Sequence, residues 1–489
     1  MTVSSSSLHL EAFRLLRAGR LDEARTTAER AVQEARVCLP THALLATVLL
    51  QLGRARDAES VVCRALELAG GIADAYDGLA YVSAALGRHE RASALYRRAA
   101  QLAPQTARFS YNLACSERSL GRLEEAEAAC DQAIAAEAAQ YPSYLLRSEI
   151  RVQTPQSNHV EELQAQLARA GADERARMFL GYALGKELDD LERFDEAFHW
   201  FSLAATTRRS RLVYDVAVDE RKMRRIAEVY PAASLATPPK APDAASDIFI
   251  VGLPRSGTTL LERVLSGLPG VSSNGETDNF SRALLAAAGE AQADADVFAR
   301  AAQADARQVA ANYHARANPL ASDGSIIEKL PMNYLYLGAI HRALPDARIL
   351  WVRRSPLDSC FAMYRTLFGE AYPFSYDFAD LACYFAAYNE LMSHWSAALG
   401  GGLHEVLYED LVREPQRVGV DAARYCGLTW TPSAVNIERN TAVSLTASAA
   451  QVRRPIYGTS SGRWRHYRRH LQPLIAELRR RGVALPEDA

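Results

Sequence analysis

The sequence lacks the features that would place it in a membrane, on nucleic acid or in an oxidising compartment. No run approaches the roughly 18–20 apolar residues of a membrane span, and no apolar stretch follows Met1. The 56 basic and 58 acidic residues give a net charge of −2, which offers no overall attraction to nucleic acid, although residues 453–481 are strongly basic. The seven cysteines are scattered without a CxxC pair, so we expect reduced thiols and a cytoplasmic protein.

The first two-fifths of the sequence follow a period of 34 residues. A Gly-Arg pair recurs four times, and an alanine stands five and twelve residues after each glycine. This is the period of tetratricopeptide repeats, in which the glycine ends one helix and the alanines let two helices approach closely. An alanine-rich helical bundle is the alternative. The pairs begin at Gly19, Gly53, Gly87 and Gly121, and the alanines are Ala24, Ala58, Ala92, Ala126, Ala31, Ala65, Ala99 and Ala133.

After the repeats the pattern changes. Residues 179–208 resemble one more, divergent repeat, residues 211–229 are expected to form a helix, and the Pro-, Ala- and Ser-rich residues 230–247 are typical of a linker. Apolar runs typical of buried strands then alternate with helical segments, which implies a parallel sheet between layers of helices. We therefore predict an α-solenoid over residues 1–210, a helix and linker over 211–245, and a P-loop-like parallel-sheet α/β domain over 246–489.

The loop that follows the first predicted strand is a phosphate-binding motif without its lysine. Gly252 and Gly257 have the spacing of GxxxxGK[ST], and Thr259 supplies the last hydroxyl, but Thr258 stands in the place of the lysine. Backbone amides and the helix dipole still favour a phosphate there, and Arg255 adds a planar fork of donors. Without the lysine, nucleoside triphosphate chemistry is disfavoured. A nucleotide kinase or ATPase and an ordinary Gly/Pro turn are the alternatives.

The segment IFIVGLPRSGTTLLE, residues 248–262, resembles the 5′-phosphosulfate loop of the sulfotransferase superfamily, which binds 3′-phosphoadenosine 5′-phosphosulfate (PAPS). The wider pattern resembles bacterial sulfotransferases with N-terminal tetratricopeptide repeats and their relatives, the protein-tyrosine sulfotransferases. The resemblance implies PAPS as donor, 3′,5′-ADP as product and no metal. The residues that it implies for the 5′-phosphosulfate are Arg255, Ser256, Gly257, Thr258 and Thr259.

Two further charged residues match the tyrosylprotein enzymes. Glu276, within Asn-Gly-Glu-Thr, falls where those enzymes carry their catalytic glutamate, and Lys329 precedes a proline at a strand end, as their lysine does. The resemblance implies that Glu276 takes the proton of the acceptor hydroxyl and that Lys329, with Arg255, stabilises charge on the leaving phosphate. A helix cap at Glu276 and a solvated lysine at 329 are the structural alternatives.

The residues implied for the 3′-phosphate side of the nucleotide lie further along the chain. Arg354 matches the arginine of the family motif, but Ala362 stands where a serine is expected, and Ser359 and Arg365 are candidates to replace it. Arg255, Lys329 and Arg354 each follow a predicted strand, so they can converge on one edge of the sheet. The remaining residues implied for this side are Tyr408 in HEVLYEDL, and Ser448, Arg454 and Tyr457 around a Gln-Val-x-basic-Pro core. The alternative for Tyr408 is a tyrosine of the core, and the alternative for the other three is a solvated basic tail.

Taken together, the resemblance implies a PAPS-dependent sulfotransferase that acts on a tyrosine of a peptide or protein. A small phenol, alcohol or carbohydrate is the alternative acceptor, and a repeat scaffold with an inactive nucleotide-binding domain is the alternative class of protein. The repeats are expected either to present a peptide or protein acceptor in their groove or to form a scaffold or homodimer surface. We expect no nucleic acid or membrane partner, and the missing anchor of the Golgi relatives favours a bacterial cytosol.

Overall fold

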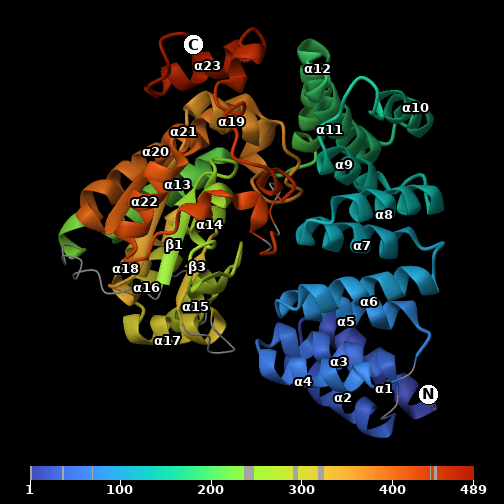
Figure 1. The fold of residues 1–489 in the computed structure, drawn as a ribbon. Helices are drawn as coiled ribbons and strands as arrows, with labels where there is room; N and C mark the ends of the chain where they lie inside the picture. The colour runs from blue at the N-terminus through green and yellow to red at the C-terminus, as the bar shows by residue number, and fades with distance from the viewer. Residues whose placement is uncertain are drawn as a thin grey trace. The chain divides into compact units, whose positions relative to one another are not determined.

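The computed structural model describes residues 3–35, 38–68, 70–235, 247–289, 296–317, 324–440, 442–444, 446 and 449–489. The chain divides into two compact units, Met1–Arg151 and Val152–Ala489 (Figure 1). Most of the predicted linker, residues 236–246, lies outside the described residues, and so does Ser448.

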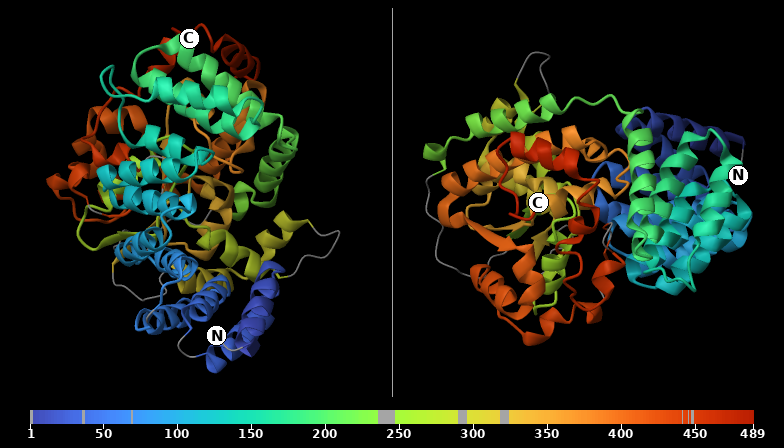
Figure 2. Two further views of the ribbon diagram at one scale, coloured as in Figure 1. Left: turned by 90° about the vertical axis from the view of Figure 1, so that its right-hand side faces the viewer. Right: turned by 90° about the horizontal axis from the view of Figure 1, so that it is seen from above.

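The first unit is a stack of helical hairpins, as the 34-residue period predicts (Figure 2). The period's glycines end the first helix of each hairpin in the left-handed region, at φ values between 72° and 82°, which suits a residue without a side chain. The first alanine of each unit is completely buried between the paired helices. The helices are α1 Val3–Arg17, α2 Leu21–Glu34, α3 Leu39–Gln51, α4 Ala55–Leu66, α5 Ala73–Ala85, α6 His89–Leu102, α7 Ala107–Leu120, α8 Leu123–Ala136 and α9 Tyr141–Ile150.

The second unit begins with four more helices, α10 Val160–Ala170, α11 Glu174–Asp190, α12 Phe194–Arg209 and α13 Val216–Val229. Helices α11 and α12 form the divergent hairpin. They pack so closely that a Cβ on Gly185 would lie 2.5 Å from the ring of Phe201. The predicted boundary at residue 210 coincides with the end of α12, inside the second compact unit.

A five-stranded parallel sheet forms the centre of the second unit, in the order β2-β3-β1-β4-β5. Its strands are β1 Asp247–Gly252, β2 Val271–Ser273, β3 Ser325–Glu328, β4 Arg348–Arg353 and β5 Leu403–Leu407. Strand β5 ends at Leu407, because Tyr408 already begins a helix. Since all five strands are parallel, their carboxyl ends lie along one edge of the sheet.

Helices cover both faces of this sheet, and side chains of β1 alternate between the two layers. Ile248 and Ile250 pack on the face covered by α14 and α22, whereas the Phe249 ring meets Phe280 of α15 and Tyr313 of α17 at 5.8 and 5.6 Å between centroids. The helices are α14 Thr258–Leu265, α15 Asn279–Ala288, α16 Val297–Gln303, α17 Ala306–Ala317, α18 Leu337–Ala343, α19 Pro356–Tyr364, α20 Phe378–Leu399, α21 Tyr408–Arg413, α22 Pro415–Tyr425 and α23 Gln472–Arg480.

Candidate active site

The loop between β1 and α14 is tightly folded and pressed against its neighbours. Arg255 has φ 65°, an uncommon left-handed conformation for a residue with a side chain, and Gly257 has φ 105°. A Cβ on Gly257 would lie 2.3 Å from the ring of Tyr408, and one on Gly252 would lie 2.6 Å from the carbonyl oxygen of Val352. Both motif glycines are therefore required by close contacts, Gly252 with β4 itself and Gly257 with the residue that follows β5.

Arg354 and Tyr408 join this loop from two neighbouring strand ends. The Arg354 guanidinium donates through Nη1 to the Arg255 carbonyl at 3.0 Å and through Nη2 to the Ser460 carbonyl, and it lies 4.6 Å from the centre of the Tyr408 ring. The Tyr408 hydroxyl is 2.6 Å from Ser460 Oγ. The structure thus brings the predicted Arg255, Arg354 and Tyr408 together, and it adds Ser460, which the sequence pattern did not single out.

Three donors in these loops have no hydrogen-bond partner among the described residues, although they are buried. They are Ser256 Oγ, Arg354 Nε and Ser355 Oγ. Native proteins satisfy nearly all buried polar atoms, so donors without partners mark a place where a ligand can complete the bonding. The loops stand at the N-termini of α14 and α19, where the helix dipoles also favour an anion.

Glu276 and Lys329 form the second group of charged residues. Lys329 is completely buried at the end of β3, and its Nζ lies 2.5 Å from Glu276 Oε1 and 3.5 Å from Glu262 Oε2. The Glu276 side chain is 31% exposed, and its Oε2 makes no hydrogen bond within the described parts of the chain. Lys329 is therefore not a solvated lysine, and Glu276 presents one unoccupied carboxylate oxygen.

A buried glutamate holds the loop that carries Glu276. Glu328 accepts hydrogen bonds from Thr277 Oγ1, from Asn274 Nδ2 at 3.0 Å and from Asn279 Nδ2 at 3.4 Å. Burial raises the pKa of Glu328 to about 7, although the three hydrogen bonds act in the opposite direction. Glu328 thus binds the loop on both sides of Glu276.

Sequence reasoning missed both Glu262 and Glu328. Glu262 stood only as the last letter of the loop motif, yet it contacts Lys329 and accepts a hydrogen bond from Ser273 Oγ. Glu328 had a usable signal, because a charged residue directly after the apolar pair of a buried strand requires a partner. The Lys329 position carried a signal too, since the chain has only four lysines among its 56 basic residues.

The segment around Gln451 contacts the loop between β1 and α14. Arg255 Nη2 donates to Gln451 Oε1 at 2.9 Å. Burial raises the pKa of Tyr457, and the nearby guanidinium groups of Arg255, Arg365 and Arg454 oppose this rise. Tyr457 and Arg454 therefore belong to the same cationic neighbourhood as the loop after β1.

Other residues of this region bind the protein itself. Arg453, beside the predicted Arg454, donates to the carbonyls of Asn440 and Ala442 at 2.9 and 3.0 Å. Ser359 Oγ lies 3.5 Å from the Arg354 carbonyl, its acceptor. Arg365 donates to Asp189 of α11 at 2.5 Å, so this candidate for the missing serine is held by a carboxylate.

Two further surveys cover only the described residues. No group of three or more His, Cys, Asp or Glu side chains there could hold a metal ion. No helix there has both the length and the apolar character needed to cross a membrane.

Comparison with known proteins agrees with this architecture. Residues 247–432 match the model of the sulfotransferase family, and residues 73–106 and 107–140 each match the tetratricopeptide repeat. Residues 247–432 thus resemble a sulfotransferase domain and residues 73–140 resemble tetratricopeptide repeats, in agreement with the parallel-sheet α/β fold and the helical hairpins.

Individual relatives are distant. An uncharacterized protein of Aquifex aeolicus (strain VF5) is 26% identical over 341 residues, which are 67% of this chain, and the chain spans 45% of that relative's length. The sulfotransferase domain of the Synechococcus PCC 7002 olefin synthase is 19% identical, with 51% of this chain and all of that domain covered and a TM-score of 0.36. The sulfotransferase domain of the curacin biosynthetic pathway is 18% identical, with 50% of this chain and all of that domain covered and a TM-score of 0.35.

Proposed function

We propose that the protein transfers a sulfuryl group from PAPS to an acceptor hydroxyl, with a tyrosine of a peptide or protein as the acceptor. One observation carries the proposal. Each of the five parallel strands ends directly before a residue or loop assigned to the site, and parallel strands place these ends on one edge. The groups are the loop of Arg255 after β1, Glu276 after β2, Lys329 after β3, Arg354 after β4 and Tyr408 after β5.

The residues of this edge fit the donor. The unpartnered Ser256 Oγ, Arg354 Nε and Ser355 Oγ supply donors for anionic oxygens, and the first turns of two helices add backbone amides. When bound, PAPS supplies an activated sulfuryl group. We assign its 5′-phosphosulfate to residues 255–259 and its 3′-phosphate side to Arg354, Tyr408, Ser448, Arg454 and Tyr457.

Glu276 and Lys329 have separate roles in the transfer step. Lys329 binds Oε1 of Glu276 and leaves Oε2 free to accept the proton of the acceptor hydroxyl. Glu262 contacts the same ammonium group from α14 and holds it in place. A lysine has three donors, so Lys329 keeps a donor for the oxygen at which charge develops on the leaving phosphate.

The acceptor and its route to the site extend the proposal further. The Glu276–Lys329 pair and the Gln-Val-x-basic-Pro loop favour a tyrosine over a small phenol, alcohol or carbohydrate, because both resemble the tyrosylprotein enzymes. The repeats match a module that binds proteins, which supports presentation of a protein acceptor. A bacterial cytoplasmic setting and a homodimer stay predictions from the sequence.

The test is a sulfation assay read by mass spectrometry. Purified protein is offered PAPS with tyrosine-containing peptides, small phenols and sugars, and we expect a mass gain of one SO₃ group on the peptides. The Glu276→Ala variant serves as the inactive control. Calorimetry with 3′,5′-ADP runs beside it. If no acceptor gains mass but 3′,5′-ADP binds, the domain is an inactive scaffold. If millimolar 3′,5′-ADP gives no heat, the assignment of the donor is wrong.

A further inference from the structure

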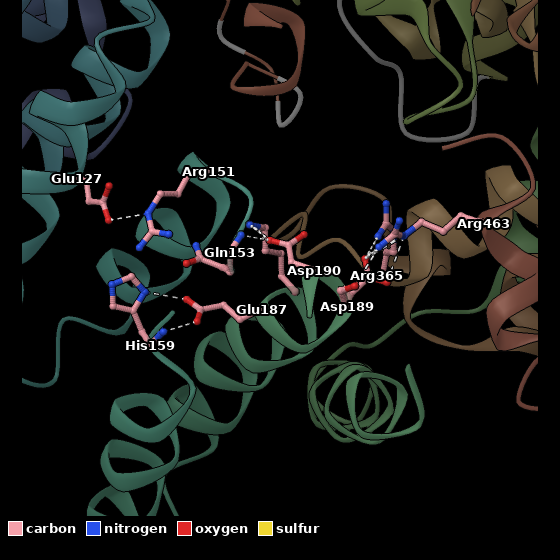
Figure 3. Close-up of polar contacts among 10 residues, drawn as sticks. Glu127, Arg151, Gln153, His159, Glu187, Asp189, Asp190, Arg365 and Arg463 are labelled. Carbon is pink, nitrogen blue, oxygen red and sulfur yellow. Dashed lines mark hydrogen bonds and ion pairs between the residues drawn. The ribbon is translucent and has the colours of Figure 1, made fainter. Parts of the chain in front are cut away.

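A buried carboxylate of the helical hairpin binds the C-terminal part of the chain. Asp189, in the last turn of α11, is 2% exposed, and both of its carboxylate oxygens are occupied. Oδ2 lies 2.5 Å from Arg365 Nη1 and 2.8 Å from Arg463 Nη2 (Figure 3). Oδ1 accepts from the Tyr467 hydroxyl at 2.5 Å. Arg463 Nη2 also donates to the Asp189 backbone carbonyl at 3.1 Å.

The two arginines keep Asp189 charged. Burial alone raises the pKa of Asp189, but the Arg365 and Arg463 guanidinium groups and the Tyr467 hydroxyl outweigh it, so the pKa lies below its ordinary value. A buried carboxylate with two cations and a hydroxyl donor is a fixed anchor, because removing the carboxylate would leave two guanidinium groups without their shared counter-ion.

The end of α11 is itself held in position by neighbouring acids. Glu187, completely buried, accepts from the His159 backbone amide at 2.6 Å, and the His159 ring Nδ1 lies 3.0 Å from it. Asp190 accepts from the Gln153 backbone amide at 2.8 Å (Figure 3). Glu187 and Asp190 thus bind the loop between α9 and α10, whereas Asp189, in the same helical turn, reaches Arg365 and Arg463 of the predicted α/β domain.

The segment that Asp189 holds is the one that covers the nucleotide-binding residues. Within residues 458–464, the Ser460 carbonyl accepts from Arg354 and the Ser460 hydroxyl contacts Tyr408. The backbone amides of Gly462 and Trp464 donate to Asp358 at 2.7 and 3.2 Å. Arg463, between these two amides, points to Asp189. The segment is therefore attached at three places, one of which lies on the helical hairpin.

We propose that Asp189 is a positioning residue for nucleotide binding. Through Arg463 it holds the segment 458–464 against Arg354 and Tyr408, so that the 3′-phosphate side of the site is closed. The inference rests on the proposed function, since it assumes that a nucleotide binds there. The hairpin α11–α12 resembles a repeat of the N-terminal array, and through Asp189 it contributes to nucleotide binding.

The test compares Asp189→Asn, Arg463→Gln and the double variant by calorimetry with 3′,5′-ADP. We expect each single change to raise Kd about tenfold and the double variant to be no weaker than the worse single variant, because the two residues act through one contact. The KM for PAPS rises in parallel, whereas kcat at saturating donor stays within about threefold of the wild type, since Glu276 and Lys329 are untouched.

The control is Asp195→Asn, whose carboxylate on α12 is exposed and contacts His470 at 2.5 Å. We expect it to leave Kd unchanged. If Asp189→Asn lowers the melting temperature without changing Kd, or if the two single effects add fully, the positioning role is overturned. Should Asp189→Asn fail to fold, Arg463→Gln with unchanged affinity overturns it equally. If the wild type binds no 3′,5′-ADP, the proposed function fails instead.

Discussion

The second unit contains two buried charge clusters of opposite composition. At Lys329 a buried cation lies between two carboxylates, those of Glu276 and Glu262. At Asp189 a buried carboxylate lies between two guanidinium groups. The two clusters differ in whether a carboxylate oxygen remains without a partner. Every oxygen of the Asp189 carboxylate has a partner, whereas Glu276 keeps Oε2 free and 31% of its side chain exposed. A saturated cluster can only hold structure, and an unsaturated one can take part in chemistry.

The largest expected effect comes from removing the free carboxylate. Glu276→Ala should lower kcat by about 10² or more, because the acceptor hydroxyl loses its proton acceptor, while Kd for 3′,5′-ADP changes little. Steady-state kinetics and calorimetry measure the two quantities separately. Glu262→Gln is the matched control, since it changes the other carboxylate on Lys329 and should cost less turnover. Equal losses of turnover and affinity in Glu276→Ala would assign Glu276 to structure.

A smaller effect is expected at the phosphate-binding loop. Arg255→Ala removes a charged donor from that loop, so affinity for 3′,5′-ADP should fall by about 10- to 100-fold. Gln451→Ala, which removes only the partner of Arg255 Nη2, should weaken binding much less. Calorimetry measures both variants. An unchanged affinity in Arg255→Ala would show that the phosphosulfate is placed wrongly.

The smallest effect on activity is expected at Glu328, whose pKa makes the free energy of unfolding depend on pH. Its pKa rises from the ordinary 4.5 to about 7, so between these values the folded protein holds a proton that the unfolded chain releases. The free energy of unfolding therefore falls as the pH rises from about 4.5 to 7, by on the order of 3 kcal/mol for this group.

Glu328→Gln carries no titrating group, so its stability should lack this decline. Urea titrations of wild type and variant at pH 5 and pH 8 measure the difference. The exposed Glu487→Gln provides the control, and its stability curve should run parallel to that of the wild type. Parallel curves for Glu328→Gln as well would mean that Glu328 is ionised throughout this range.

Much of the fold was predictable because its signals are local. The 34-residue period and the apolar run before Gly252 are read within one helix pair or one strand–loop–helix unit. The family resemblance identified Glu276, Lys329 and Arg354 as residues that follow strands. The sheet order places the ends of these strands on one edge.

The rest was not predictable because it depends on contacts between distant segments. Asp189 and Arg463 are 274 residues apart in the chain, and no spacing rule connects them. Ser460 binds Arg354 through its carbonyl and Tyr408 through its hydroxyl, and both partners lie far from it in the chain, so no local pattern marks it. In the sequence, Glu262 looks like an ordinary helix residue and Glu328 like the end of a strand. Only the folded structure shows that Glu262 contacts Lys329 and that Glu328 binds the loop of Glu276.

The carbonyl of Ser460 has a consequence for turnover. Because it accepts from Arg354 Nη2 within the protein itself, that donor keeps a partner when no anion is bound. A buried guanidinium group left bare would oppose the departure of any anion that it holds. On the proposed function, Nη1 and Nη2 keep their carbonyl partners throughout, and Nε is the donor of Arg354 that loses its partner when the product leaves.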